Sequence, residues 1–182
     1  MLEIIVPETE LFDNKTLTFI NIKEQKLKLE HSLVSISKWE AKWHKSYFIQ
    51  EAKTVEEFRD YVRCMTLTQN VNPDTYLGLT NNNIDQIVRY IDDPMTASTI
   101  SDRGQKSNPY NFVTSELVYY WMFSYQIPYE CSKWHFNRLM MLIKIFNAKN
   151  SQEEPSKRSE ADIMEENRRR NAEMRAKFKS KG

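Results

Sequence analysis

The chain of 182 residues is the size of one ordinary domain with room for a short appendage. Apolar residues make up 40% and charged residues 28%, which is too apolar for a disordered chain. The net charge of +1 gives no overall attraction to nucleic acid or to anionic membranes. The 3 glycines lie outside any phosphate-binding pattern, so neither a P-loop nor a dinucleotide-binding turn is expected.

No signal peptide or membrane span is expected. The N-terminal sequence MLEIIVPETE has no basic start and no long apolar stretch. The most apolar window, VYYWMFSYQI, is too short to cross a bilayer and ends at Pro128. The two cysteines, Cys64 and Cys131, are far apart and outside any CxxC spacing, which favours reduced thiols over a disulfide framework.

The sequence of residues 1–34 is typical of β-strands. The run LEIIVP is rich in β-formers, and TLTFINI and KLKLEHSL alternate apolar and polar residues. We expect a small antiparallel sheet or hairpin of two or three strands. Because an isolated hairpin is only marginally stable, its apolar face should pack on the helices that follow.

Residues 35–150 are predicted to be helical. Ser37 with Glu40 and Thr54 with Glu57 have capping-box spacing before two amphipathic segments. A third amphipathic helix should end before Pro94, and residues 95–111 should form an exposed loop. The stretches 112–127 and 131–147 are the most apolar and predict a helical hairpin in the core. The expected fold is mainly α (α+β), with about five helices in a compact bundle.

Residues 151–182 differ in composition from the globular part, which we place at 1–150. Residues 153–166 contain six acids and two bases, whereas residues 168–182 contain seven bases and one acid. This order complements a helix dipole, so we expect a charged linker and a C-terminal tail helix. Its basic and aromatic residues are candidate partner-binding residues: Arg168, Arg169, Arg170, Arg175, Lys177, Phe178, Lys179 and Lys181. A solvated helix that only adds solubility is the alternative, and nucleic acid is disfavoured because no aromatic platform interleaves with the bases.

Three pairs of residues are candidates for a catalytic or metal-binding site. Cys131 and His135 have the i, i+4 spacing of a nucleophile with its base or of half a zinc site. Glu40 and His44 have the spacing of an acid–base pair, and Asp92 with Asp93 could bind a metal. Too few further ligands exist for a zinc site, so we favour a buried thiol for Cys131 and a hydrogen bond at a helix end for His135. For Glu40 and His44 we favour a solvated helix face, and for Asp92 and Asp93 a turn. Neither a metal nor a cofactor is expected, and no catalytic residue is assigned.

Several strings resemble a known group of proteins. They are LEHSLVSISKWEAKWHKSYF at 29–48, DYVRCMTL at 60–67, IDDPMTAST at 91–99, the apolar segment 115–147 and the closing NRRRNAEMRAKFKSKG. The chain resembles small proteins encoded in the tail-gene modules of long-tailed bacteriophages and prophages, which include tail assembly chaperones. The resemblance covers nearly the whole chain, and its motifs are packing motifs without a catalytic signature.

The resemblance implies a non-enzymatic assembly factor that acts in the host cell cytoplasm. Such a protein would bind the tape measure protein, keep its long helices soluble during tail assembly, and contact other tail proteins or itself. The alternative is a structural component retained in the virion tail. Phe112, Tyr119 and Tyr120 could form a groove for a client helix, although we favour core packing for them. We also expect Trp134 to fill the core.

Overall fold

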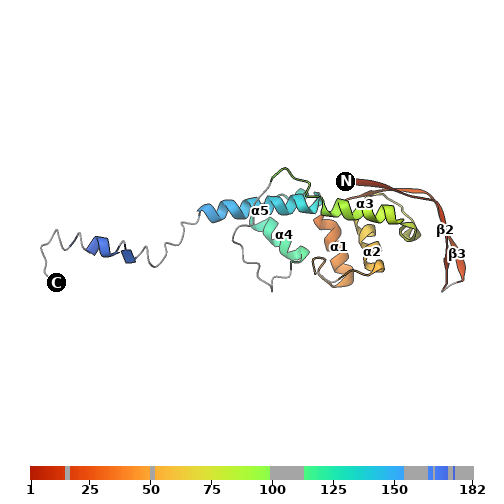
Figure 1. Cartoon of the computed structure of the whole chain (residues 1–182), viewed down its shortest axis with the longest axis horizontal. Coiled ribbons are helices and arrows are strands. Elements are labelled where there is room, and N and C mark those ends of the chain that lie inside the picture. Colours follow the sequence, from red (N-terminus) through yellow and green to blue (C-terminus); the bar gives the residue numbers. More distant parts are fainter. Residues whose placement is uncertain are drawn as a thin grey trace. The chain divides into compact units, whose positions relative to one another are not determined.

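A computed structural model describes residues 1–14, 17–49, 52–98, 113–153, 164–165, 167–171 and 174 (Figure 1). The chain divides into two compact units, Met1–Lys144 and Ile145–Gly182. The division falls inside the last long helix, a few residues before the boundary expected from composition. The fold class is confirmed: a small antiparallel β-structure precedes a compact set of helices. None of the described helices is both long and apolar enough to cross a membrane.

The N-terminal β-structure is one bent hairpin with four short strands. Strands β1 (Leu2–Val6) and β4 (Gln25–Leu29) pair antiparallel, and β2 (Thr9–Asp13) pairs with β3 (Thr18–Ile22) in the same way. The two sheets are separated where Pro7, which has no N–H to donate, interrupts the ladder. The alternation of residues predicted antiparallel strands correctly, but the expected number of two or three was wrong, because each arm of the hairpin is divided into two strands and the hairpin splits into two sheets.

Helix α1 (Leu33–Trp43) begins earlier than the sequence predicted. Ser32 is its N-cap and forms a capping box with Ser35, whereas Ser37 lies inside the helix. The Ser37–Glu40 box was therefore wrong. The box at Thr54 and Glu57 is confirmed, and it opens helix α2 (Val55–Met65).

The next elements connect the helices to the hairpin. A short 3₁₀ helix, η1 (Pro73–Gly78), precedes helix α3 (Asn81–Asp92), which ends before Pro94 as predicted. A Cβ atom at Gly78 would lie 3.0 Å from Cδ1 of Ile22 and 3.2 Å from Cγ1 of Val6. Glycine therefore allows η1 to pack directly against both halves of the hairpin.

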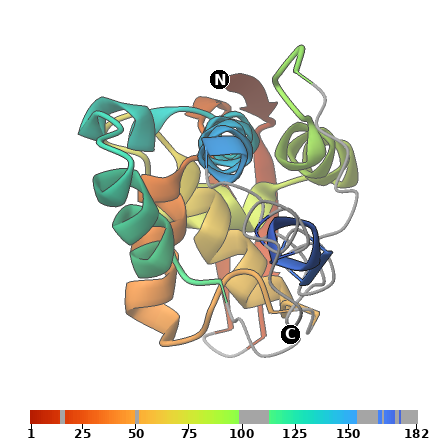
Figure 2. The same ribbon diagram turned by 90° about the vertical axis from the view of Figure 1, so that its left-hand side faces the viewer.

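The apolar segments form helix α4 (Ser115–Ser124), the 3₁₀ helix η2 (Tyr129–Lys133) and helix α5 (Phe136–Glu153). Most of the expected loop at 95–111 lies outside the described residues. In the view along the long axis, α4 and α3 lie on opposite sides of the start of α5 (Figure 2). The backbone N–H of Phe136 donates to the carbonyl of His31 at 2.7 Å, which joins α5 to the end of the hairpin.

The core of Met1–Lys144 lies between the first half of the hairpin and the helices. Its fully buried side chains come from every layer, and the largest of them are Trp39, Tyr61, Leu27, Leu29, Leu33, Ile36, Met65, Ile87, Met122, Leu139 and Ile143. Strands β1 and β4 bury alternate residues, so one face of this sheet packs on helices, as the period of two predicted.

Candidate partner-binding surface

The N-terminus of α4 is held by side chains from the region of α1. Glu40 is buried, and its two carboxylate oxygens accept from the backbone N–H groups of Tyr47 at 2.7 Å and Ser115 at 2.8 Å. The Ser46 hydroxyl donates to the carbonyl of Val113 at 2.6 Å. A carboxylate beside the first N–H groups of a helix also offsets the positive end of its dipole. Glu40 thereby fixes where α4 begins.

This position of Glu40 corrects the interpretation of its pairing with His44. We expected a solvated helix face, but Glu40 is buried and binds two backbone groups. His44 is exposed and ends α1 in the left-handed conformation, with a φ of 54°. The two side chains therefore have separate structural settings.

Helix α4 buries one face and exposes another, although almost every residue in its centre is apolar. Val118 and Met122 are buried, four residues apart. Tyr120 and Phe123 point outward and keep 65% and 66% of their surface exposed. Large aromatic side chains on a solvent-facing helix surface are a common mark of a binding site.

The 3₁₀ helix η2 exposes a further aromatic side chain. Tyr129 is 53% exposed, and its ring stacks on that of Tyr119 with centroids 6.1 Å apart and planes at 15°. Burial, followed by the proximity of Tyr129, raises the pKa of Tyr119 to about 12, so its hydroxyl stays neutral. We call Tyr120, Phe123 and Tyr129 the aromatic stripe.

The outcome for the three candidate groove residues differs from one to the next. Tyr120 is exposed, so core packing was the wrong choice for it. Tyr119 is half-buried against Tyr129. Phe112 lies outside the described residues. The hydrophobic pattern of the sequence could not predict which face of α4 is exposed, because apolar residues occupy both faces and no polar face can be assigned to solvent.

Cys131 and His135 do not share a helix face. Cys131 lies in η2 and His135 immediately precedes α5, and both are buried. Burial, reinforced by Glu130, raises the pKa of the Cys131 thiol, which opposes formation of the thiolate that a nucleophile or zinc ligand needs. His135 uses Nε2 to hydrogen-bond the carbonyl of Tyr90 at 2.9 Å.

His135 belongs to a buried polar cluster that the sequence did not suggest. Its ring lies 5.2 Å from that of His31, centroid to centroid, and Nδ1 of His31 hydrogen-bonds the hydroxyl of Tyr61. Burial, together with the nearby His135, lowers the pKa of His31 to about 3. Within the described residues, Nδ1 of His135 is buried without a hydrogen-bond partner. The cluster joins the hairpin end, α2, α3 and the start of α5.

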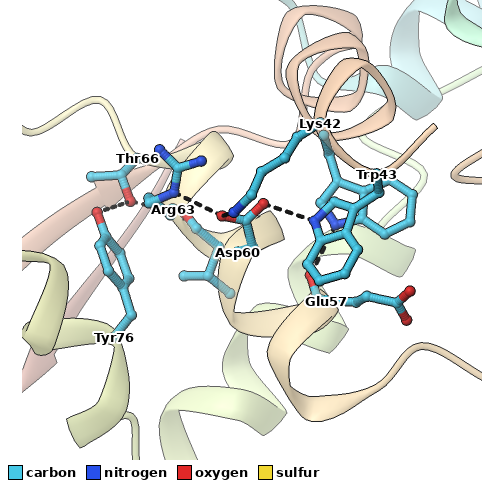
Figure 3. A network of polar contacts seen from close by, with 9 residues as sticks. Lys42, Trp43, Glu57, Asp60, Arg63, Thr66 and Tyr76 are labelled. Carbon is cyan, nitrogen blue, oxygen red and sulfur yellow. Dashed lines mark hydrogen bonds and ion pairs between the residues drawn. The ribbon is translucent and has the colours of Figure 1, made fainter. Parts of the chain in front are cut away.

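A second polar network joins α1 to α2 (Figure 3). Asp60 accepts from Nζ of Lys42 at 2.7 Å, Nε of Arg63 at 2.8 Å and Nε1 of Trp43 at 2.9 Å. Burial alone would raise the pKa of Asp60, but these donors outweigh it and the pKa is lowered. The Asp60–Arg63 pair has i, i+3 spacing within α2, but Lys42 and Trp43 come from α1, and no spacing rule within a single helix reveals their contacts with Asp60.

Asp92 and Asp93 form the end of α3, as the turn interpretation proposed. The Asp93 carboxylate accepts from the backbone N–H of Met95 at 2.7 Å. The Asn137 side-chain amide donates to the carbonyls of Ile91 and Asp93 at 2.9 and 2.8 Å. Across the described ranges, no group of three or more His, Cys, Asp or Glu side chains is placed to hold a metal ion.

The structure describes only part of the candidate basic tail. Arg168, Arg169 and Arg170 lie in a helical stretch at 167–171 and are exposed. The remaining candidates, Arg175, Lys177, Phe178, Lys179 and Lys181, lie outside the described residues. The assignment of partner binding to this tail stays a prediction.

Searches of protein-family models, curated proteins and solved structures found no match.

Proposed function

We propose that the chain is a non-enzymatic, chaperone-like assembly factor of bacteriophage tails that binds the tape measure protein in the host cytoplasm. The observation that carries the binding role is the aromatic stripe, in which three aromatic side chains keep at least 53% of their surface exposed. The assignment to phage tails rests on the sequence resemblance.

The stripe suits an amphipathic client helix. Tyr120 and Phe123 lie three residues apart on a helix whose start is fixed by Glu40, so they form a preorganised apolar surface. Tyrosine and phenylalanine contribute large contact areas and lose little side-chain entropy on binding. A long tape measure helix offers repeated apolar side chains at i, i+3 and i+4 for such a surface.

A first experiment tests whether the tape measure protein is the client. The full chain and segments of the tape measure protein are co-expressed, and their association is measured by co-purification and titration calorimetry. We expect the double variant Tyr120→Ser/Phe123→Ser to weaken binding at least about tenfold, as loss of aromatic anchors does. Val88→Ser is the matched control, because Val88 is 42% exposed on α3 and should not contribute.

Equal binding by the double variant and the native chain would contradict the role of the stripe. No binding of the native chain to any tape measure segment would contradict the proposed client.

The second candidate is a structural component retained in the virion. It is favoured by the second half of the hairpin, where Phe12, Leu17 and Phe19 are 49%, 74% and 64% exposed and available for subunit contacts. Mass spectrometry of purified particles distinguishes the two roles. A chaperone should be missing from particles, whereas a structural component should be present in a fixed ratio to the tail proteins.

A further inference from the structure

The outer edges of the first half of the hairpin are covered by other parts of the chain. The Asn83 amide donates to the carbonyl of Ile5 at the outer edge of β1, at 3.1 Å. Along β4, the N–H of Leu67 donates to the carbonyl of Lys28 at 2.8 Å, and the N–H of Glu30 donates to the carbonyl of Met65 at 2.9 Å. This half therefore has little edge left for another strand.

The second half has an open edge at β3. Within the described part of the chain, the backbone hydrogen bonds of residues 19–22 are those of the β2–β3 pair. In an antiparallel ribbon, alternate residues direct their N–H and C=O groups outward, so residues 19–22 of β3 offer donors and acceptors to a further strand. In Figure 1 the β2–β3 ribbon extends away from α1, α2 and α3.

The side chains of β3 favour pairing with another strand. Proteins usually protect open edges with charged residues, and β2 contains Glu10 and Asp13. Strand β3, with the sequence TFINI, contains no charged residue. Phe19 contacts Phe12 of the neighbouring strand with ring centroids 5.1 Å apart and planes tilted by 60°, and both rings remain about half exposed or more. A two-stranded ribbon with this much exposed apolar surface gains stability from further strands.

We propose that β3 pairs antiparallel with β3 of a second copy of the chain, around a two-fold axis at Ile20. The resulting sheet has four strands in the order β2, β3, β3 and β2. Ile20 lies opposite Ile20 of the second copy, and Phe19 lies opposite its Asn21. Because Leu11 pairs with Ile20 within each copy, one continuous row of four apolar side chains crosses the sheet.

The charge pattern of the ribbon leaves this edge free of like-charge repulsion against a second copy. In this register every side chain that faces its counterpart across the new β3–β3 contact is uncharged. Glu10 and Asp13 are on the outer strands, so like charges do not meet across the axis. The two-fold arrangement is also closed, which is the commonest form of self-association. One five-residue edge per copy is a small contact, so we expect dissociation in the micromolar range.

Sedimentation equilibrium of the full chain over the micromolar range tests this proposal without involving the proposed client. We expect the native chain to approach twice the monomer mass at high concentration. Ile20→Lys and Ile20→Glu should each remain monomeric, because each puts like charges opposite one another at the axis. An equimolar mixture of the two variants should dimerise again. Ile5→Lys is the matched control and should still dimerise, because Ile5 is 55% exposed on β1, outside the new contact.

A covalent test does not depend on whether the charged variants fold. Two cysteines facing one another at the axis would have Cα atoms close enough for a disulfide. We expect Ile20→Cys to form a linked dimer under mild oxidation much faster than Leu11→Cys. A native chain that stays monomeric throughout, or equal linking rates for the two cysteine variants, would overturn the proposal. Dimers that persist in both Ile20 charge variants would place the contact elsewhere and would also overturn it.

Discussion

At the scale of single residues, buried polar groups connect elements that are distant in sequence. Glu40 binds backbone groups of residues 47 and 115, Asp60 accepts from both α1 and α2, and His31 contacts Tyr61 and His135. Each group would be costly to bury without its partners. The stability of the fold should therefore depend strongly on these few side chains.

Acid should destabilise the protein through His31. Its pKa is about 3 in the folded chain and 6.5 when exposed, so below neutral pH the unfolded chain binds the extra proton. The free energy of unfolding should therefore fall as pH decreases from about 6.5 towards 3, by about 2 kcal/mol between pH 7 and pH 5. Urea unfolding at both pH values measures this loss. His31→Gln should show a smaller dependence, and an unchanged dependence in that variant would contradict the assignment.

Asp60→Ala should destabilise the α1–α2 contact. The change leaves the indole N–H of Trp43 and the cations of Lys42 and Arg63 without their shared acceptor. We expect a loss of about 2 kcal/mol in the free energy of unfolding. Asp85→Ala, an exposed aspartate on α3, is the control and should change stability by less than about 0.5 kcal/mol. Similar effects of the two substitutions would show that the network contributes little.

At the scale of elements, local patterns predicted most helices and strands but not the exposed face of α4. The Thr54–Glu57 box and the alternation in β1 and β4 are local signals, and the structure confirms both. The start of α1 was missed because Ser32 and Ser35 form a box without the usual Glu or Gln. The outward face of α4 could not be predicted, because tertiary packing alone distinguishes Tyr120 from Val118.

The different burial of two tryptophans predicts different losses of stability when each is replaced by alanine. Trp39 is 2% exposed, and its indole N–H donates to the carbonyl of Glu57 at 2.9 Å, so Trp39→Ala should cost about 3 to 5 kcal/mol. Trp134 was expected to fill the core, but it is only partly buried and Arg138 lies over its ring at 4.4 Å. We therefore expect Trp134→Ala to cost about 1 to 2 kcal/mol. Thermal or urea unfolding gives the comparison, and equal losses would show that exposure is a poor guide here.

At the scale of the whole molecule, the two compact units have different compositions. The unit Met1–Lys144 contains the hairpin, the aromatic stripe and both polar networks. The described residues of the unit Ile145–Gly182 include the exposed Arg168, Arg169 and Arg170. The globular and basic parts can therefore be tested separately.

Removal of residues 151–182 should leave the fold intact and weaken partner binding. The deleted segment is rich in charge and contributes few apolar side chains, so its contribution to the core should be small. Thermal unfolding and client titration of the shortened chain give the two measurements. A large fall in the thermal midpoint would show that the segment packs on the globular part.

The backbone hydrogen bond from Phe136 to His31 also constrains how the chain can fold during synthesis. The strands of the hairpin are complete once residue 29 has been made, and β1 can then pair with β4. The end of that hairpin is nevertheless hydrogen-bonded to α5, and the start of α4 is hydrogen-bonded to Glu40. More than a hundred residues of chain separate His31 from its partner Phe136. A ribosome-bound chain that stops before residue 136 should therefore be sensitive to protease. Protection should appear only after the first turns of α5 have left the exit tunnel.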